Sequence, residues 1–175
     1  MIEPFTLTGR HVRLEPLAAA HVDGLAAAAA EERGSYGYTW VPDGPDETAR
    51  YVEAALEHAS AGRAVPFAVR RLADGVLVGS TWYAASAQRT AINTECKLLL
   101  LTHAFETWRS LRVTLKTDAR NAASRRAIER IGGRFEGVRR VHTVATDGSL
   151  RDTAYFSIVA AEWFTVRAGL VARLG

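Results

Sequence analysis

Residues 92–133 constrain the fold most strongly, because helical and strand patterns alternate along them. Apolar residues recur at helical spacing over residues 92–108, which predicts a long helix with a broad buried face. Residues 111–116 alternate between apolar and polar side chains, as a half-buried strand does, and a short helix is predicted from Asn121 to Gly132. Together with a strand before residue 92, this order requires a crossover connection, and hence some parallel pairing.

The patterns on both sides of this stretch add further strands and helices. A hairpin is predicted for residues 66–83, since an Asp74–Gly75 turn separates the strand patterns at 66–71 and 76–83. The other predicted elements are a strand at 11–14, helices at 18–31 and 46–61, strands at about 134–144 and 151–159 joined by an Asp147–Gly148 turn, and a last helix at about 161–173. The chain is therefore predicted to have a mixed α+β fold of the broad α/β class.

The size and composition of the chain suit one ordinary domain, because 175 residues with 48% hydrophobic content can bury a sizeable core. The single cysteine, Cys96, excludes an intrachain disulfide. No apolar stretch approaches the roughly 20 residues that a membrane-spanning helix needs, and the first residues lack the order of a signal peptide. We therefore expect a cytoplasmic protein that does not associate with membranes.

The net charge of +3 is too small to indicate a dedicated nucleic-acid-binding protein. Arginines occur in pairs, yet acidic residues are mixed among them. The sequence has neither helix-turn-helix spacing nor an aromatic and basic RNA-binding signature. A mixed, solvated surface with one local anion site fits better, and no metal site is predicted.

The first segment suited to a ligand comes immediately before the long helix. A helix N-terminus presents unpaired backbone N–H groups and a positive dipole end, which suits a pyrophosphate, and small side chains let phosphate oxygens approach the backbone. The same segment also fits a purely structural interpretation, in which Asn93 or Thr94 caps the helix and Gln88 is a loop residue. The residues concerned are Gln88, Arg89, Thr90, Ala91, Ile92 and Asn93.

A second such segment begins the short helix that follows the next strand. Asn121 can cap this helix by accepting a hydrogen bond from the N–H of Ser124. If the preceding strand lies parallel in the same sheet, Asn121 and Ser124 project toward the same crevice as the start of the long helix. The two segments therefore support a common ligand site.

Four segments of the chain resemble, in order and spacing, those of the GNAT superfamily of N-acetyltransferases, and more narrowly its branch that acetylates the N-termini of ribosomal proteins. They are residues 9–17, 88–95, 118–124 and 147–152. The resemblance covers nearly the whole chain and implies a single N-acetyltransferase domain over residues 1–175. It also implies a central mixed, mostly antiparallel sheet flanked by helices, with acetyl-CoA as the co-substrate.

The same resemblance implies roles for the two ligand segments. Residues 88–93 would bind the pyrophosphate of coenzyme A, while Asn121 and Ser124 would lie along the pantetheine arm and near the thioester. Ala91 and Asn93 depart from the family pattern, which has glycine at the first of these positions and glycine or alanine at the second. Asn93 is therefore expected to alter the cofactor geometry and could supply a contact of its own.

A larger departure lies between Gly75 and Gln88, where the family has two strands and this chain has room for one. Either a central strand is shortened or missing, or residues are absent between about Gly79 and Trp82. In many relatives that strand carries the carboxylate that helps to deprotonate the amine. It also forms the bulge beside which the thioester lies.

Acetyl transfer needs a neutral amine, a polarised thioester carbonyl and a proton for the departing thiolate. A backbone N–H near Trp82 and Tyr83 could polarise the carbonyl, and the hydroxyl of Ser124 or Tyr155 could protonate the thiolate. His142 could serve as the base, because histidine titrates near neutrality. Simpler interpretations stay open, with Tyr155 as a core aromatic residue and His142 as a surface residue.

Two other bases are compatible with the sequence. Glu95 could act in place of His142, although the resemblance implies a structural role for it at the helix start, and a water molecule could relay the proton. The leading hypothesis is an acetyl-CoA-dependent N-acetyltransferase whose acceptor is a primary amine, either a protein N-terminus or a small molecule, which attacks the thioester directly. The alternative is a non-catalytic acyl-CoA-binding protein on the same fold. A homodimer is compatible with the sequence, which does not fix the oligomeric state.

Overall fold

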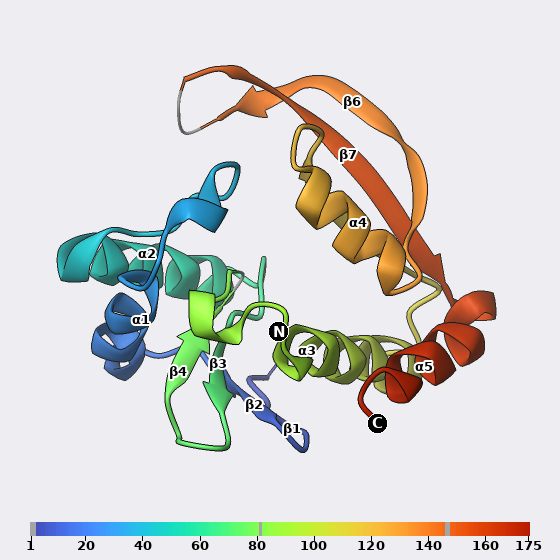
Figure 1. Cartoon of the computed structure of the whole chain (residues 1–175), viewed down its shortest axis with the longest axis horizontal. Helices are drawn as coiled ribbons and strands as arrows, with labels where there is room; N and C mark the ends of the chain where they lie inside the picture. The colour runs from blue at the N-terminus through green and yellow to red at the C-terminus, as the bar shows by residue number, and fades with distance from the viewer. Residues whose placement is uncertain (1–2, 81, 146–147) are drawn as a thin grey trace. The chain divides into compact units, whose positions relative to one another are not determined.

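The computed structural model describes residues 3–80, 82–145 and 148–175 of the chain (Figure 1). Backbone contacts group the chain into two compact units, Met1–Cys96 and Lys97–Gly175. Within the described ranges, no helix combines the length and the apolar character needed to cross a membrane.

The first unit contains a four-stranded antiparallel sheet in the order β1-β2-β3-β4. Pro45 lies in the first turn of α2, where its missing N–H costs no helical hydrogen bond. The first helix is shorter than predicted because a 3-10 turn, Ala19–His21, precedes it. The elements are β1 (Leu7–Thr8), β2 (Val12–Pro16), α1 (Val22–Ala29), α2 (Gly44–Ser60), β3 (Phe67–Arg71) and β4 (Leu77–Gly79), with further 3-10 turns at Gly34–Tyr36 and Ala85–Ala87.

The core of this unit forms between its sheet and its two helices. Val12 and Leu14 alternate with more exposed residues along β2, and Leu14 lies opposite the buried Val69 of β3. Leu25 of α1 and Val52 of α2 are also almost completely buried. Helix α2 therefore has one buried and one exposed face.

The predicted hairpin is present, but its second strand is shorter than expected. Gly75 adopts φ +73° in the turn, and the Asp74 carboxylate accepts a hydrogen bond from the N–H of Val76 at 3.1 Å. The sequence predicted a strand as far as Tyr83, whereas β4 ends at Gly79. The strand that follows the turn therefore spans three residues.

The chain reverses immediately after β4. The N–H of Ser80 donates to the carbonyl of Trp82 at 3.0 Å, and Gly79 faces Tyr83 in an isolated antiparallel bridge. A β-carbon on Gly79 would lie 1.9 Å from the carbonyl oxygen of Trp82, so this reversal requires glycine. Thr81, which the predicted strand included, lies outside the described residues.

Helix α3 (Ala91–Thr102) leads into the second unit, whose three-stranded antiparallel sheet has the order β5-β7-β6. Its strands and helices agree closely with the predicted ones. Asp147, half of the predicted turn between the last two strands, lies outside the described residues. The elements are β5 (Arg112–Asp118), α4 (Ala122–Arg130), β6 (Arg134–Val144), β7 (Leu150–Val159), a 3-10 turn at Ala160–Glu162 and α5 (Trp163–Ala172).

The helix predicted over residues 92–108 is present, but it is α-helical only as far as Thr102 and continues as a π-helical turn, His103–Thr107. Apolar spacing over one turn does not distinguish the two hydrogen-bond patterns. The expected parallel pairing does not occur among the described strands, whose pairs are all antiparallel. At Gly79, the edge of β4 away from β3 is already occupied by the chain's own reversal, which bridges Gly79 to Tyr83.

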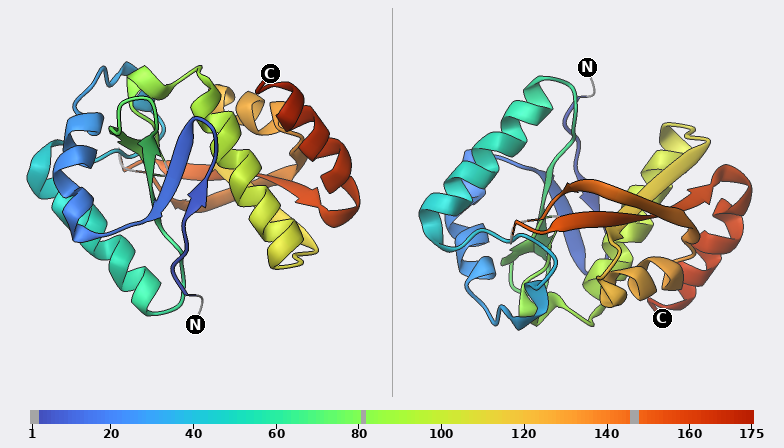
Figure 2. Two further views of the ribbon diagram at one scale, coloured as in Figure 1. Left: turned by 90° about the horizontal axis from the view of Figure 1, so that it is seen from below. Right: turned by 90° about the horizontal axis from the view of Figure 1, so that it is seen from above.

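In Figure 2, β6 and β7 run beside each other as two long strands. The two faces of β7 differ sharply, because successive side chains of a strand point to opposite faces. One face packs against helices: Phe156 clusters with Ile128 of α4, and Ile158 clusters with Trp163 of α5. The opposite face carries polar residues, among them Tyr155. This polar face of the three-stranded sheet is where two of the candidate catalytic side chains lie.

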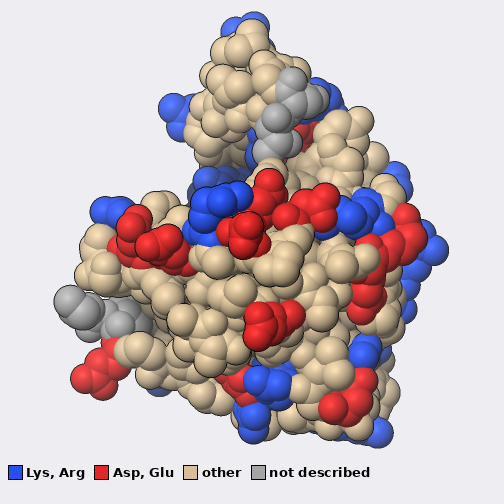
Figure 3. Space-filling view, turned by 90° about the vertical axis from the view of Figure 1, so that its left-hand side faces the viewer, with Lys and Arg blue, Asp and Glu red and all other residues tan. Residues whose placement is uncertain are grey.

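Charged side chains of both signs are mixed on the surface. On the face drawn in Figure 3, lysines and arginines lie next to aspartates and glutamates. This agrees with the mixed surface expected from the small net charge. Local clusters of charge therefore indicate possible ligand sites better than the net charge does.

Candidate functional site

The loop that the sequence analysis assigned to the cofactor is fixed by its own side chains. The Gln88 amide nitrogen donates to the hydroxyl of Ser35 at 2.8 Å and to the carbonyl of Tyr83 at 2.9 Å. The next residue, Arg89, is exposed and has φ +60°, a conformation that non-glycine residues seldom adopt. Gln88 thus holds the loop, while Arg89 turns the chain into α3.

Helix α3 begins at Ala91, earlier than either cap considered from the sequence. The hydroxyl of Thr90 accepts a hydrogen bond from the N–H of Ile92 at 3.3 Å and donates to the carbonyl of Ala87 at 2.7 Å. Thr90 therefore takes the capping position. The suggestion that Asn93 or Thr94 caps the helix is wrong, because both residues lie inside it.

A cavity of about 400 Å³ lies beside the start of α3. Arg71 borders it, and Asp74 fixes that guanidinium at 2.7 Å from Nη2 and 3.0 Å from Nε. The residues that line the cavity are Arg10, His11, Arg71, Leu72, Ala73, Ser86, Thr90, Ala91 and Ile92. Two arginines and the positive end of a helix therefore surround one space, which suits an anion.

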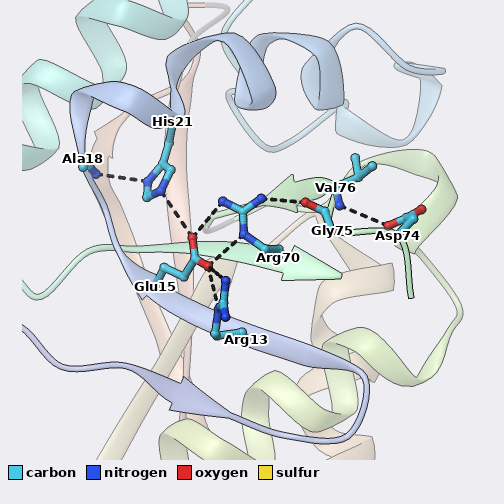
Figure 4. A network of polar contacts seen from close by, with 8 residues as sticks. All are labelled: Arg13, Glu15, Ala18, His21, Arg70, Asp74, Gly75 and Val76. Carbon is cyan, nitrogen blue, oxygen red and sulfur yellow. Dashed lines mark hydrogen bonds and ion pairs between the residues drawn. The ribbon is translucent and has the colours of Figure 1, made fainter. Parts of the chain in front are cut away.

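A network of charged side chains on the sheet positions the turn that borders this cavity (Figure 4). Glu15 accepts hydrogen bonds from Arg13 at 2.6 Å and from Arg70 at 2.8 and 2.9 Å, and His21 lies 3.4 Å away. The contacts with Arg70 and then Arg13 lower the pKa of Glu15 to about 2. Arg70 also donates to the carbonyl of Gly75 at 2.6 Å. The β3–β4 turn is thereby tied to β2.

Glu95 has a structural position rather than the one expected of a base. Its carboxylate accepts hydrogen bonds from the backbone N–H groups of Arg10 at 2.7 Å, His11 at 2.6 Å and Val12 at 2.8 Å. The residue is almost completely buried. Because three donors already occupy its oxygens, the structural role that the family resemblance implied fits Glu95 better than catalysis.

Trp82 and Tyr83 lie in the reversal between β4 and α3. Trp82 is buried, and its Nε1 has no hydrogen-bond partner among the residues that the structure describes. Burial and a hydrogen bond with the thiol of Cys96 raise the pKa of the Tyr83 hydroxyl. The carbonyl of Tyr83 accepts from Tyr36 at 3.2 Å as well as from Gln88. These two residues thus connect the loop to the interior of the first unit.

In the second unit, Asn121 caps α4 as predicted, with its Oδ1 accepting from the N–H of Ser124 at 2.9 Å. Asp118, at the end of β5, accepts from the backbone N–H and the guanidinium of Arg120, both at 2.9 Å. The Arg120 guanidinium, more than any other group, lowers the pKa of the Asp118 carboxyl despite its burial. The start of α4 therefore has a defined geometry, with Ser124 half-buried in its first turn.

His142 and Tyr155 lie together on the polar face of the second sheet. His142 Nδ1 lies 3.0 Å from the hydroxyl of Thr153, and its ring centre lies 6.0 Å from that of Tyr155. Partial burial, and then the charges of Arg139, Lys116 and Arg151, lower the pKa of His142. Its imidazole is therefore neutral at pH 7, as a base must be.

Ser124 is not brought to the same side of this sheet as His142 and Tyr155. Helix α4 packs on the opposite face, where its Ile128 meets Ala154 and Phe156. Among the described residues, no group of three or more His, Cys, Asp or Glu side chains is arranged to hold a metal ion.

Sequence reasoning missed the basic residues that border the cavity beside α3 and those that surround His142. Arg10, Arg71 and the basic neighbours of His142 were noticed, if at all, only as parts of arginine pairs. The alternating pattern of β5 could have indicated that Lys116 lies on the polar face of the sheet, because its neighbours in the strand are more buried. Nothing in the sequence indicates that residues 10, 71 and 90–92 border one cavity.

Comparison with known proteins gives one family and many similar folds. The model of the acetyltransferase (GNAT) domain matches residues 11–134. No curated protein matches the chain. A GCN5-related N-acetyltransferase from Brucella melitensis is 28% identical with a TM-score of 0.87, over 99% of this chain and 87% of that one.

Two ribosomal-type enzymes are similar in fold. RimJ of Mycobacterium smegmatis, in complex with CoA-disulfide, is 21% identical with a TM-score of 0.79, over 97% of this chain and 95% of that one. The RimL ribosomal L7/L12 α-N-protein acetyltransferase, without ligand, is 16% identical with a TM-score of 0.75, over 90% and 96% of the two chains. At these identities the likeness concerns the fold alone.

Proposed function

Because the chain belongs to the GNAT acetyltransferase family and is an N-acetyltransferase, we propose that it transfers the acetyl group of acetyl-CoA to a primary amine, which attacks the thioester directly. The observation that carries this proposal is the cavity beside the start of α3. The GNAT family uses acetyl-CoA, and its phosphate groups need a positively charged site such as this cavity provides.

The proposed pyrophosphate site consists of the first turn of α3 and two arginines. The backbone N–H groups at the start of α3 carry the positive end of the helix dipole. Arg71 is held in place by Asp74, and Arg10 enters the same cavity from the loop before β2. Ala91 adds only a methyl group to the surface that the phosphates would approach, so the departure from glycine at this position is tolerable.

Asn121 and Ser124 have proposed roles along the pantetheine arm and near the thioester. The capping bond between them supports this, because it fixes the first turn of α4. A backbone N–H near Tyr83 is proposed to polarise the thioester carbonyl. Gly79 and Tyr83 face each other in the reversal, and that pairing fixes the direction of the Tyr83 peptide group.

The proposed reaction balances as a single acyl transfer. The amine nitrogen bonds to the carbonyl carbon, and the carbon–sulfur bond breaks. His142, neutral at pH 7, accepts the proton that the amine loses, while the hydroxyl of Tyr155, on the same face of the sheet as His142, protonates the departing thiolate. The acceptor is proposed to be a protein N-terminus or a small molecule, and the ribosomal-protein enzymes of similar fold favour the protein N-terminus.

Release of free thiol from acetyl-CoA in the presence of an amine panel tests this function. We expect thiol release that depends on the amine, together with a matching amount of acetylated product. An Arg10→Gln variant should weaken coenzyme A binding about ten-fold, since one charge-assisted contact is worth roughly 1.5 kcal/mol or more. Arg63→Gln, an exposed residue after α2, is the control of equal charge. Coenzyme A binding without thiol release on any amine would instead indicate a non-catalytic acyl-CoA-binding protein.

A further inference from the structure

Basic side chains surround His142 on the polar face of the second sheet. Lys116 of β5 lies opposite Tyr155 of β7, and Arg139 of β6 lies opposite Thr153. Residues that face each other in an antiparallel pair project to the same side, as do residues two apart on one strand. Arg151 therefore projects to the same side as Thr153 and Tyr155. We call Lys116, Arg139 and Arg151 the basic face.

The acidic groups near the basic face do not balance its charge. Asp118 lies 3.8 Å from Arg151 but makes its closest ion pair with Arg120, at 2.9 Å. Asp152 accepts a hydrogen bond from the N–H of Val141. Within the described part of the chain, Lys116 and Arg139 have no carboxylate within ion-pair distance, and both side chains are exposed. The basic face thus carries an excess of positive charge, and the Nε of Arg151 is buried without a hydrogen-bond partner among the described residues.

We propose that the basic face binds a carboxylate of the acceptor, so that preferred acceptors are amines with a carboxylate close to the amino group. Arginine and lysine recognise carboxylates through charge-assisted hydrogen bonds. His142 and Tyr155 lie within the same row of side chains, so an anchored carboxylate would leave the neighbouring amine near the base. This inference rests on the proposed acetyl transfer, because the bound carboxylate places the amine for that reaction. Both an acidic peptide N-terminus and a free amino acid have the required chemistry.

The same arrangement links acceptor binding to the proton affinity of His142. In the free protein, partial burial and then the charges of Arg139, Lys116 and Arg151 disfavour a protonated imidazole. Of the nearby acids, Asp118 is paired with Arg120, and Glu136, which accepts from Ser157, is paired with Arg112. A bound carboxylate would offset the charge of the basic face. His142 would then accept a proton more readily when the acceptor is bound, which is when the amine must lose one.

Matched acceptors that differ only in charge test this inference. One pair is a hexapeptide that begins with aspartate and the same peptide that begins with asparagine. A second pair is free aspartate and its diamide. For each compound we would measure thiol release from acetyl-CoA, and binding to the coenzyme A-loaded protein by calorimetry. We expect the acidic member of at least one pair to bind at least ten-fold more tightly, and the pair that shows the preference identifies a peptide or a small-molecule acceptor.

Substitutions locate the preference on the protein. Arg139→Gln and Lys116→Met should each raise KM for the acidic acceptor several-fold, whereas KM for the amide acceptor should change much less. Arg173→Gln, an exposed residue at the end of α5, removes the same charge elsewhere in the second unit. Circular dichroism would verify that each variant folds. A purely structural role for Arg139 would lower activity on both acceptors equally.

The two proposals fail in different ways. Equal binding of the acidic and amide members of both pairs overturns the basic face as a carboxylate site, even if both amines are acetylated. A preference for the acidic member without thiol release from any amine supports the carboxylate site and counts against acetyl transfer. A preference that survives in the Lys116→Met, Arg139→Gln double variant also overturns the inference, because the carboxylate would then bind elsewhere.

Discussion

A β-carbon at Gly9 would lie 2.4 Å from the Cδ atom of Glu95. That glycine lets the loop before β2 close around the carboxylate, which accepts three consecutive backbone N–H groups at 2.6 to 2.8 Å. The contact joins the first turns of α3 to β2, and α3 begins at the proposed pyrophosphate site. Gly9, which is distant from α3 in the sequence, thus helps to fix the direction of the helix that is proposed to bind the cofactor.

Glu95→Gln should destabilise the protein by about 2 kcal/mol, because an amide nitrogen would replace one buried acceptor and leave an N–H without a partner. Urea denaturation would measure the free energy of unfolding. Glu53→Gln, on the exposed side of α2, is the control and should change it by less than about 0.5 kcal/mol. A Glu95→Gln protein of normal stability that has lost turnover would contradict this and indicate a catalytic base.

Local sequence patterns predicted most of the elements. The hairpin turn follows from Asp74 and Gly75, and the cap of α4 follows from Asn121, because each depends on residues a few positions apart. The end of β4 could not be predicted in this way. It depends on the close approach of the Trp82 carbonyl to Gly79, and the apolar residues that follow β4 continue to look like a strand.

The candidate site was predicted unevenly for the same reason. Loop residues 88–93 and the start of α4 were found from the local chemistry of helix termini and from the family resemblance. Arg10 and Arg71 were missed because they border the cavity only after three distant segments have folded together. The charge around His142 was also missed, since it depends on the register of three strands.

Lowering the pH should destabilise the protein through Glu15. The folded-state pKa of Glu15, about 2, lies below its ordinary value of 4.5, so the ion pairs with Arg13 and Arg70 contribute stability above pH 4.5. That contribution is lost as the pH falls from 4.5 toward 2, and at roughly 1.4 kcal/mol per pKa unit it amounts to at most about 3.5 kcal/mol. Urea denaturation between pH 2.5 and 6 would measure it. In Glu15→Gln, the free energy of unfolding should depend less on pH over this range, and an unchanged slope would contradict the assignment.

Gly79→Ala should destabilise the protein by about 2 kcal/mol or more, because the added carbon meets backbone, which cannot rotate away. The matched control is Gly37→Ala: Gly37 has φ −43°, and no described heavy atom lies within 4 Å of its added β-carbon. Thermal denaturation of both variants would compare them. If Gly79→Ala melts at the wild-type temperature, the reversal after β4 does not have the described geometry.

The pH dependence of turnover tests the role of His142 directly. Because burial and neighbouring cations lower its pKa, His142 is neutral at pH 7, and kcat/KM should fall only below the ordinary histidine pKa of 6.5. His142→Gln should reduce kcat by about 100-fold or more and remove this acid limb, since general base catalysis is typically worth 10² to 10⁴. His58→Gln, on the exposed end of α2, is the control and should leave the profile unchanged. If the acid limb persists in His142→Gln, another group or a water molecule accepts the proton.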